Sequence, residues 1–135
     1  MKNKQKFIIG GILLVLIVFI FSLKSKFQKE NENFDTFNVN FHSDSIFQMS
    51  RINFPIRGQL IDGFENHDWN AKNWQFITTE VGSKNLPKEF REKVIKTDSL
   101  VIENIWIENS GFKLERQFKK MNSQWFLTYY NEVNL

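Results

Sequence analysis

Strict alternation of apolar and polar side chains in the last third of the chain is the feature that most constrains its fold. From Phe112 to Met121, one side of an extended chain would carry Phe112, Leu114, Arg116 and Phe118, and the other Lys113, Glu115, Gln117 and Lys119. A period of two is typical of a strand with one buried face. Because Ser110-Gly111 and Asn122-Ser123 are turn signals, we predict an antiparallel meander of three strands: Ser99–Asn109, Phe112–Met121 and Trp125–Tyr130.

The chain before the meander predicts short helices and strands. Phe34, Phe37 and Phe41 share one helical face, and Ser43 or Asp44 can cap a second short helix. We then predict, in order, an extended segment ended by Pro55, a strand at Ile56–Ile61, a turn at Asp62-Gly63, a strand at Trp74–Val81 and a short helix at Leu86–Ile95. Helices and strands in this arrangement indicate the α+β class.

The apolar run from Phe7 to Leu23 holds seventeen residues without a charge, between Lys6 and Lys24. As a helix it would extend roughly 25 Å at 1.5 Å per residue, close to the ~30 Å of a hydrocarbon core. We predict a single-pass signal-anchor. A cleaved signal peptide and a buried soluble helix are the alternatives; the exit Ser22–Lys26 is a poor cleavage site.

The charges divide the chain into two parts. Residues 1–26 carry five Lys and no acidic residue, whereas residues 27–135 carry thirteen basic and fifteen acidic residues, a net charge of −2. The basic pI of about 9.2 therefore comes from the first part, and no basic face for nucleic acid is expected. Lys flanking the apolar run favours an N-terminus inside the cell.

Three regions follow from these observations. Residues 1–26 are a cytoplasmic tip and anchor (span 7–23), residues 27–33 a polar stalk, and residues 34–135 an α+β domain. The domain is expected on the periplasmic or extracellular side of the cell membrane. The chain has no Cys, which excludes disulfides and thiolate chemistry.

One face of the predicted meander carries polar residues among apolar ones. If both connections are two-residue turns, Arg116 faces Ile105 on one side and Tyr129 on the other, with Glu103 diagonal to Arg116. A three-residue turn would instead pair Arg116 with Asn104. Glu103, Arg116 and Tyr129 are therefore candidate pocket residues.

This trio has three interpretations. Arg116 could hold an anion in a ligand pocket while Tyr129 donates a hydrogen bond. Glu103 and Arg116 could instead form a buried structural ion pair. In a cryptic enzyme, Glu103 would be a carboxylate base, although a nearby Arg116 would lower its pKa and weaken it.

Other candidate sites are fewer. Trp69 and Trp74 flank a polar loop and are a candidate interaction pair if exposed, or core residues if buried. His42 and His67 lack the spacing of metal ligands, so solvated or capping roles are expected. Asp44 and Arg51 could form a local ion pair. No phosphate loop, nucleophile elbow or HExxH motif occurs, so no cofactor and no metal are expected.

A block near the start of the domain resembles a known family. It reads Phe34-x-x-Phe37, then Phe41-x-x-Asp44-Ser45-x-Phe47-Gln48-x-Ser50-Arg51-Ile52-x-Phe54-Pro55. Gly111-Phe112 and Trp125-Phe126-Leu127 are similar to the closing strands of the same family. It is an uncharacterised family of exported bacterial proteins with a nuclear-transport-factor-2-like (NTF2-like), cystatin-like fold, and the resemblance covers roughly residues 34–130.

The resemblance implies a bent antiparallel sheet wrapped by short helices around a cone-shaped cavity. The family commonly carries a lipoprotein signal, which this Cys-free chain lacks, and it supplies no activity to transfer. The sequence thus predicts a membrane-anchored, non-enzymatic envelope protein whose domain binds a partner protein or a small ligand. A subunit of a membrane-spanning assembly, similar in layout to bitopic secretion-channel subunits, is an alternative.

Overall fold

The computed structural model describes residues 30–135. The predicted anchor, residues 7–23, and the start of the predicted stalk, residues 27–29, lie outside the described residues. Within residues 30–135, no helix combines the length and apolar character needed to cross a membrane.

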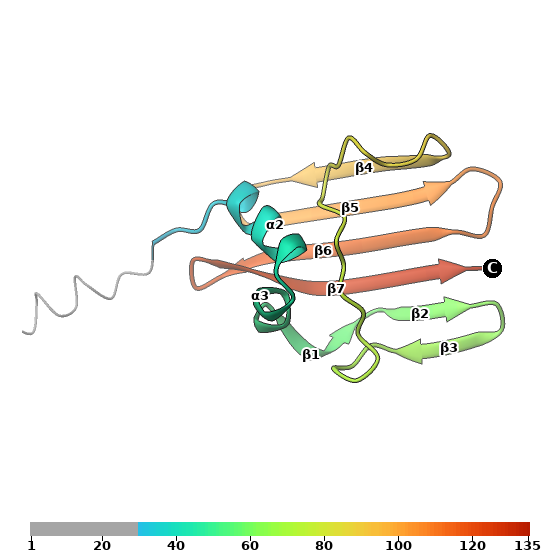
Figure 1. Ribbon diagram of the computed structural model, residues 1–135, viewed down its shortest axis with the longest axis horizontal. Helices are drawn as coiled ribbons and strands as arrows, with labels where there is room; N and C mark the ends of the chain where they lie inside the picture. Colours follow the sequence, from blue (N-terminus) through green and yellow to red (C-terminus); the bar gives the residue numbers. More distant parts are fainter. Residues whose placement is uncertain (1–29) are drawn as a thin grey trace, which may run out of the picture. The chain divides into compact units, whose positions relative to one another are not determined.

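Two short helices precede a set of strands in the described chain (Figure 1). The helices are α2 (Phe34–Ser43) and α3 (Ser45–Ser50). The strands are β1 (Ile52–Arg57), β2 (Gln59–Asp62), β3 (Glu65–Asp68), β4 (Phe90–Lys96), β5 (Leu100–Ile107), β6 (Lys113–Met121) and β7 (Gln124–Asn134). The α+β class, the two helices and the three-stranded meander β5–β6–β7 are as the sequence predicts.

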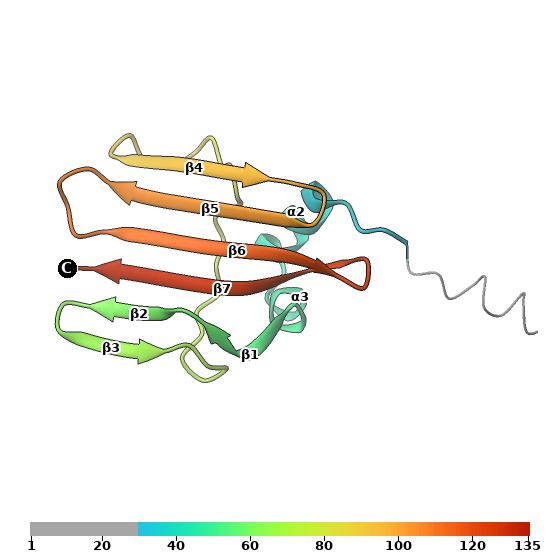
Figure 2. The same cartoon turned by 180° about the vertical axis from the view of Figure 1, so that it is seen from behind.

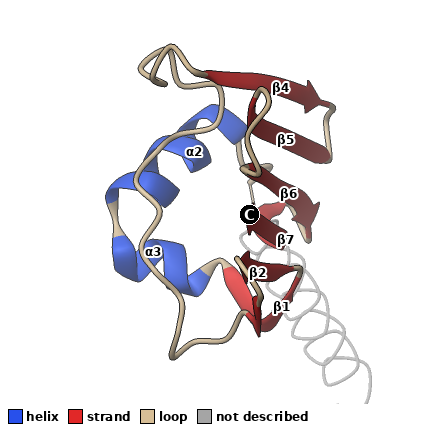
Figure 3. Ribbon diagram, turned by 90° about the vertical axis from the view of Figure 1, so that its right-hand side faces the viewer, coloured by secondary structure: helices blue, strands red, loops and turns tan. Residues whose placement is uncertain are grey.

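The strands form a mixed sheet in the order β3-β2-β7-β6-β5-β4, with β1 also pairing with β7. The prediction of a purely antiparallel sheet is wrong, because β1 and β2 both run parallel to β7. Both helices lie on one face, which we call the inner face, and no helix of residues 30–135 lies on the opposite, outer face (Figure 2). Seen from the side, the sheet bends around the helices (Figure 3).

A capping side chain fixes the N-terminal end of each helix. Asn33 accepts hydrogen bonds from the backbone N–H groups of Asp35 (2.8 Å) and Thr36 (3.2 Å) at the start of α2. Asp44 closes α2 and, as predicted, caps α3 by accepting from Ile46 and Phe47. Such caps satisfy backbone donors that a helix leaves unpaired at its first turn.

The aromatic face of α2 builds the core. Phe34, Phe37 and Phe41 are buried, and their ring centroids lie 5.8, 5.7 and 5.4 Å from that of Phe118 on β6. All three contacts are edge-to-face, the arrangement that aromatic quadrupoles favour. The predicted spacing of i, i+3 and i+7 therefore marks the face that holds the helix on the sheet.

The predicted ion pair between Asp44 and Arg51 does not form. Arg51 instead binds Glu32 in a two-point contact of 2.9 and 3.0 Å, and also donates to the carbonyl of Trp125. Glu32 in turn accepts from the backbone N–H of Trp125. The end of the predicted stalk, from Asn31, thus belongs to the same unit as the domain.

Residues Trp74–Gly82, which we call the strap, cross the inner face without forming the strand predicted there (Figure 1). Side-chain amides take the place of a neighbouring strand. Gln48 donates to the carbonyl of Ile77 and accepts from its N–H, at 2.8 and 3.1 Å. Asn38 makes the same two-point contact with Val81, both at 3.1 Å. At Ile77 and Val81, the backbone of the strap is therefore satisfied by side chains of the helices instead of by a neighbouring strand.

The predicted helix at Leu86–Ile95 is wrong, since most of it is strand β4. Phe90 and Glu92 are half-buried on the inner face, and Arg91 and Lys93 are exposed. This alternation and the β-branched pair Val94-Ile95 suit a strand. Pro87 lies in the turn before it, where its carbonyl accepts from the N–H of Phe90.

Candidate functional site

A buried ion pair occupies the centre of the inner face. Glu103 on β5 and Arg116 on β6 lie directly opposite each other, in neither of the two predicted registers. The five residues between β5 and β6 make a longer connection than a two-residue turn, which shifts the pairing. The Arg116 Nε donates to Glu103 Oε2, and the two residues are 1% and 0% exposed. The interpretation as a buried ion pair is therefore confirmed.

The guanidinium of Arg116 also joins two other elements. Its NH1 group donates to His42 Nε2 on α2 at 3.0 Å, and its NH2 group donates to the carbonyl of Thr79 in the strap at 2.9 Å. All three nitrogens are thus engaged within the protein. Two of its five N–H donors remain, but an anion arriving at Arg116 would meet a guanidinium whose charge Glu103 already neutralises.

His42 is buried and neutral rather than solvated or capping as predicted. Its Nδ1 lies 2.7 Å from the carbonyl oxygen of Asn38, which can only accept, so Nδ1 carries the proton. Nε2 is then free to accept from Arg116. Burial, and next the charge of Arg116, lower the pKa of His42 to about 3.

A second carboxyl group lies beside the ion pair. The N–H of Gly82, at the end of the strap, lies 3.0 Å from Glu92 Oε1 and 3.2 Å from Glu103 Oε1. Burial first, and then the hydrogen bond and charge of Glu103, raise the pKa of Glu92 to about 7. Both causes disfavour the ionised form of Glu92, because burial removes its carboxylate from water and the charge of Glu103 repels a second negative charge.

Tyr130, and not Tyr129, lies on the inner face. The pairing of β6 with β7 shifts between Gln117 and Phe118, where β7 has one extra residue between Leu127 and Tyr129, so Arg116 faces Tyr130 while Tyr129 faces Gln117. The extra residue reverses the alternation of β7, so the placement of Tyr129 in the candidate pocket is wrong. Tyr130 is 7% exposed and donates to Glu132 Oε2 at 3.2 Å. Burial and the charge of Glu132 raise the pKa of Tyr130, which keeps its proton.

A cavity of about 310 Å³ lies beside the ion pair on the inner face. Most of its lining is apolar: Ile77, Leu86, Pro87, Phe90, Ile105, Phe112 and Leu114. The polar residues around it are Thr79, Arg116, Tyr130 and Glu132. Glu103 does not line it, because its carboxylate is covered by Arg116 and Gly82.

Trp69 and Trp74 belong to an aromatic cluster instead of an exposed pair. Trp69 is 5% exposed, and the rings of Trp69, Trp74 and Tyr130 pack edge-to-face with centroids 5.1–5.5 Å apart. Trp74 donates its indole N–H to Gln48 Oε1. These three rings, with Glu132, Ile77 and Thr79, border a second cavity of about 240 Å³. Tyr130 and Glu132 therefore lie at the boundary of both cavities.

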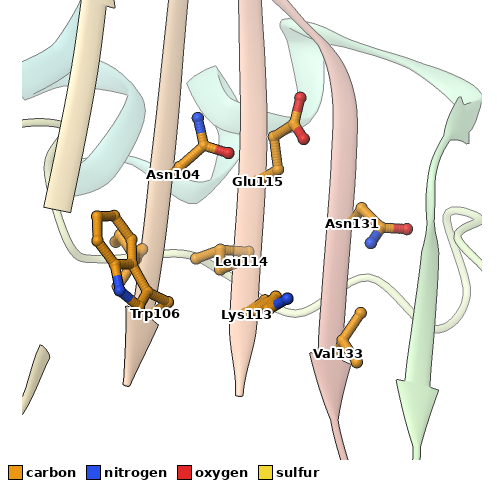
Figure 4. Close-up of a pocket in the computed structure, with 8 residues that line it drawn as sticks. Asn104, Trp106, Lys113, Leu114, Glu115, Asn131 and Val133 are labelled. Atoms are coloured by element: carbon orange, nitrogen blue, oxygen red, sulfur yellow. The ribbon is translucent and has the colours of Figure 1, made fainter. Parts of the chain in front are cut away.

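The outer face has a depression of its own, of about 470 Å³ (Figure 4). The side chains of Asn104, Trp106, Glu115, Asn131 and Val133 border it, on the side of the sheet away from the helices. Its polar groups are exposed or half-buried. It lacks the buried charges and the overlying strap that distinguish the inner cavity.

Comparison with known proteins identifies the fold. No protein-family model and no curated protein matches the chain. A cystatin-like protein from Bacteroides caccae superposes with a TM-score of 0.59 at 19% identity, over 76% of this chain and 77% of that one. The fold is the cystatin-like, NTF2-like fold. The sequence resemblance predicted this fold, and the bent sheet around two helices agrees with it.

Two further solved structures support the same fold. A protein from Bacteroides uniformis has a TM-score of 0.55 at 21% identity, over 78% of each chain. An NTF2-like protein from Bacteroides fragilis has a TM-score of 0.51 at 22% identity, over 79% of this chain. The alignment spans about half (49%) of that longer protein.

Sequence reasoning missed His42, Glu92, Tyr130 and Glu132. Asn38 and His42 are four residues apart beside the aromatic face of α2, a spacing that could have indicated their burial on the sheet side. Glu92 was hidden by the wrong helix prediction. The inward direction of Tyr130 and Glu132 depends on the bulge, for which we find no local sequence signal.

We expect the effects of substitutions at Glu103 and Arg116 on the free energy of unfolding to be coupled. Glu103→Gln should lower the free energy of unfolding by about 3 kcal/mol, because it leaves the buried guanidinium uncompensated. Glu115→Gln, on the outer face of β6, is the matched control and should change it by less than about 0.5 kcal/mol. The double variant Glu103→Gln/Arg116→Met should lose less than the sum of its single variants in urea unfolding. Strict additivity would contradict the coupling.

The pH dependence of stability should show two opposing groups. The pKa of Glu92 is raised from 4.5 to about 7, so its contribution to stability is full below pH 4.5 and is lost as pH rises toward 7. The pKa of His42 is lowered from 6.5 to about 3, so its contribution is full above pH 6.5 and is lost as pH falls toward 3. Between pH 4.5 and 6.5 the two effects oppose each other.

Removing the Glu92 carboxyl should leave the pH dependence of stability that is due to His42. In Glu92→Gln, stability should rise with pH between 4.5 and 6.5 more steeply than in the unaltered protein, as measured by urea midpoints at half-unit intervals. Glu89→Gln, at an exposed position nearby, is the control. An unchanged pH profile in Glu92→Gln would show that this carboxyl does not titrate in that range.

Proposed function

We propose that the domain binds a small, largely apolar molecule in the inner cavity. The observation that carries this proposal is the cavity of about 310 Å³ between the sheet and the loop that includes the strap. Its size and its mostly apolar wall with few polar groups are typical of small-molecule sites. The ligand would lie over Leu114 and Ile105, with its polar end toward Tyr130 and Glu132.

The surroundings of the cavity support binding more than catalysis by Glu103. A general base must come within hydrogen-bonding distance of its substrate. Glu103 is fully buried beneath Arg116, and its carboxylate already accepts from Arg116 and Gly82. These contacts suit a structural role, in which the ion pair holds the wall of the cavity in place.

We further propose that residues 7–23 anchor the protein in the cell membrane, with the domain on the periplasmic or extracellular side. Support comes from the uncharged seventeen-residue run between Lys6 and Lys24 and from the five Lys of residues 1–26. A ligand site in this domain would then sample molecules outside the cytoplasm.

Membrane anchoring predicts that the full chain stays in the membrane fraction after alkaline carbonate extraction, with an intact mass of 16.2 kDa. Val15→Lys/Val18→Lys should release it, because each Lys at a helix centre costs about 2.5–3.5 kcal/mol on insertion. Added protease should digest the domain from outside the cell. A shortened chain would indicate a cleaved signal peptide instead.

Ligand binding can be tested with 2-naphthalenemethanol, a neutral probe with a compact apolar body, by calorimetry on the full chain in nonionic detergent. Leu114→Trp places a bulky ring in the cavity and should weaken binding at least about tenfold, or about 1.4 kcal/mol. Leu100→Trp adds the same bulk on the outer face of β5 and should leave the affinity unchanged. Equal binding by both variants would place the probe elsewhere.

A further inference from the structure

The charges beside the two inner cavities are unequally compensated. Arg116 and Glu132 are the charged residues among those that border either cavity in the described part of the chain. Arg116 is neutralised by Glu103. Glu132 accepts a hydrogen bond from Tyr130, and within residues 30–135 no Lys, Arg or His forms a salt bridge with it. The net charge presented to a ligand is therefore negative.

The position of Glu132 makes this charge available to a ligand. It follows Tyr130 by two residues on β7 and pairs with Leu114 of β6, so it shares the inner face with both. It is half-buried, at the boundary between the apolar cavity and the aromatic one. A carboxylate partly removed from water beside apolar walls gains from a cationic partner.

The aromatic cluster adds to the attraction for a cation. Trp74 and Tyr130 border the same cavity as Glu132, and their ring centroids are 5.1 Å apart. Aromatic rings attract ammonium groups through the negative charge of their faces, most strongly where water is excluded. A carboxylate next to aromatic rings is a combination that suits an organic ammonium ion.

We propose that the ligand is an organic cation, with an ammonium group held by Glu132 and an apolar body over Leu114 in the larger cavity. This inference rests on the proposed function, since it names the ligand class for the same cavity. An anionic ligand, which the sequence alone suggested through Arg116, is disfavoured because Glu103 already neutralises that guanidinium and Glu132 borders the same cavity.

Three probes with one apolar body test the charge preference. They are 2-naphthylmethylamine (a cation at pH 7), 2-naphthalenemethanol (neutral) and 2-naphthoate (an anion), each titrated into the full chain in nonionic detergent by calorimetry. We expect the cation to bind at least tenfold more tightly than the neutral alcohol, and the anion to bind most weakly.

Two variants assign the preference to Glu132. Glu132→Gln keeps the shape of the side chain and should bring the affinities for the amine and the alcohol to within about twofold of each other. Glu115→Gln, on the outer face, should retain the full preference. If Glu132→Gln proves too unstable to study, Glu132→Thr removes the same carboxylate with a side chain that suits a strand, and it should abolish the preference in the same way.

The outcomes separate this inference from the function on which it rests. If the alcohol binds and Leu114→Trp blocks it, but the amine is not preferred, cation selectivity is overturned while ligand binding stands. Selectivity that survives in Glu132→Gln overturns the role of this residue. If none of the three probes binds, both the proposed site and the cation inference are overturned.

Discussion

The arrangement of the inner face depends on the contacts that the guanidinium of Arg116 makes. It binds a carboxylate on β5, an imidazole on α2 and a carbonyl of the strap, so three elements distant in sequence meet at one side chain. A buried ion pair is a poor source of net stability, since desolvation offsets its attraction. Here it fixes geometry instead, because each of the three guanidinium nitrogens has one partner, and each partner lies on a different element.

Side-chain amides perform a related task for the strap. Gln48 and Asn38 each offer one donor and one acceptor to a backbone segment, which is what a neighbouring strand would offer. The strap therefore crosses the sheet at a distance set by helices. This spacing leaves the cavity between Ile77 above and Leu114 below, where a paired strand would have filled it.

Local sequence patterns predicted the parts of the fold that depend on interactions between residues close in the sequence. The Phe spacing of α2, the Asp44 cap and the alternation around Arg116 depend on neighbours a few residues away. The failures depend on distant partners. The strap looked like a strand because Thr78 and Thr79 favour one, yet its backbone bonds to side chains of the helices and of β4, β5 and β6 instead of to a neighbouring strand. The site was half predicted: Glu103 and Arg116 pair, whereas Tyr129 was assigned to the wrong face because alternation alone does not reveal a bulge.

The bulge in β7 gives the ligand site an unusual dependence on chain length. The bulge reverses which side chains of β7 face the helices. After it, Tyr130 and Glu132 face the cavity and Asn131 and Val133 face outward. Loss of one residue at this point would exchange the two sets. An acidic, aromatic wall would then become a neutral one without any amino-acid substitution, and the charge preference proposed for the cavity would be lost.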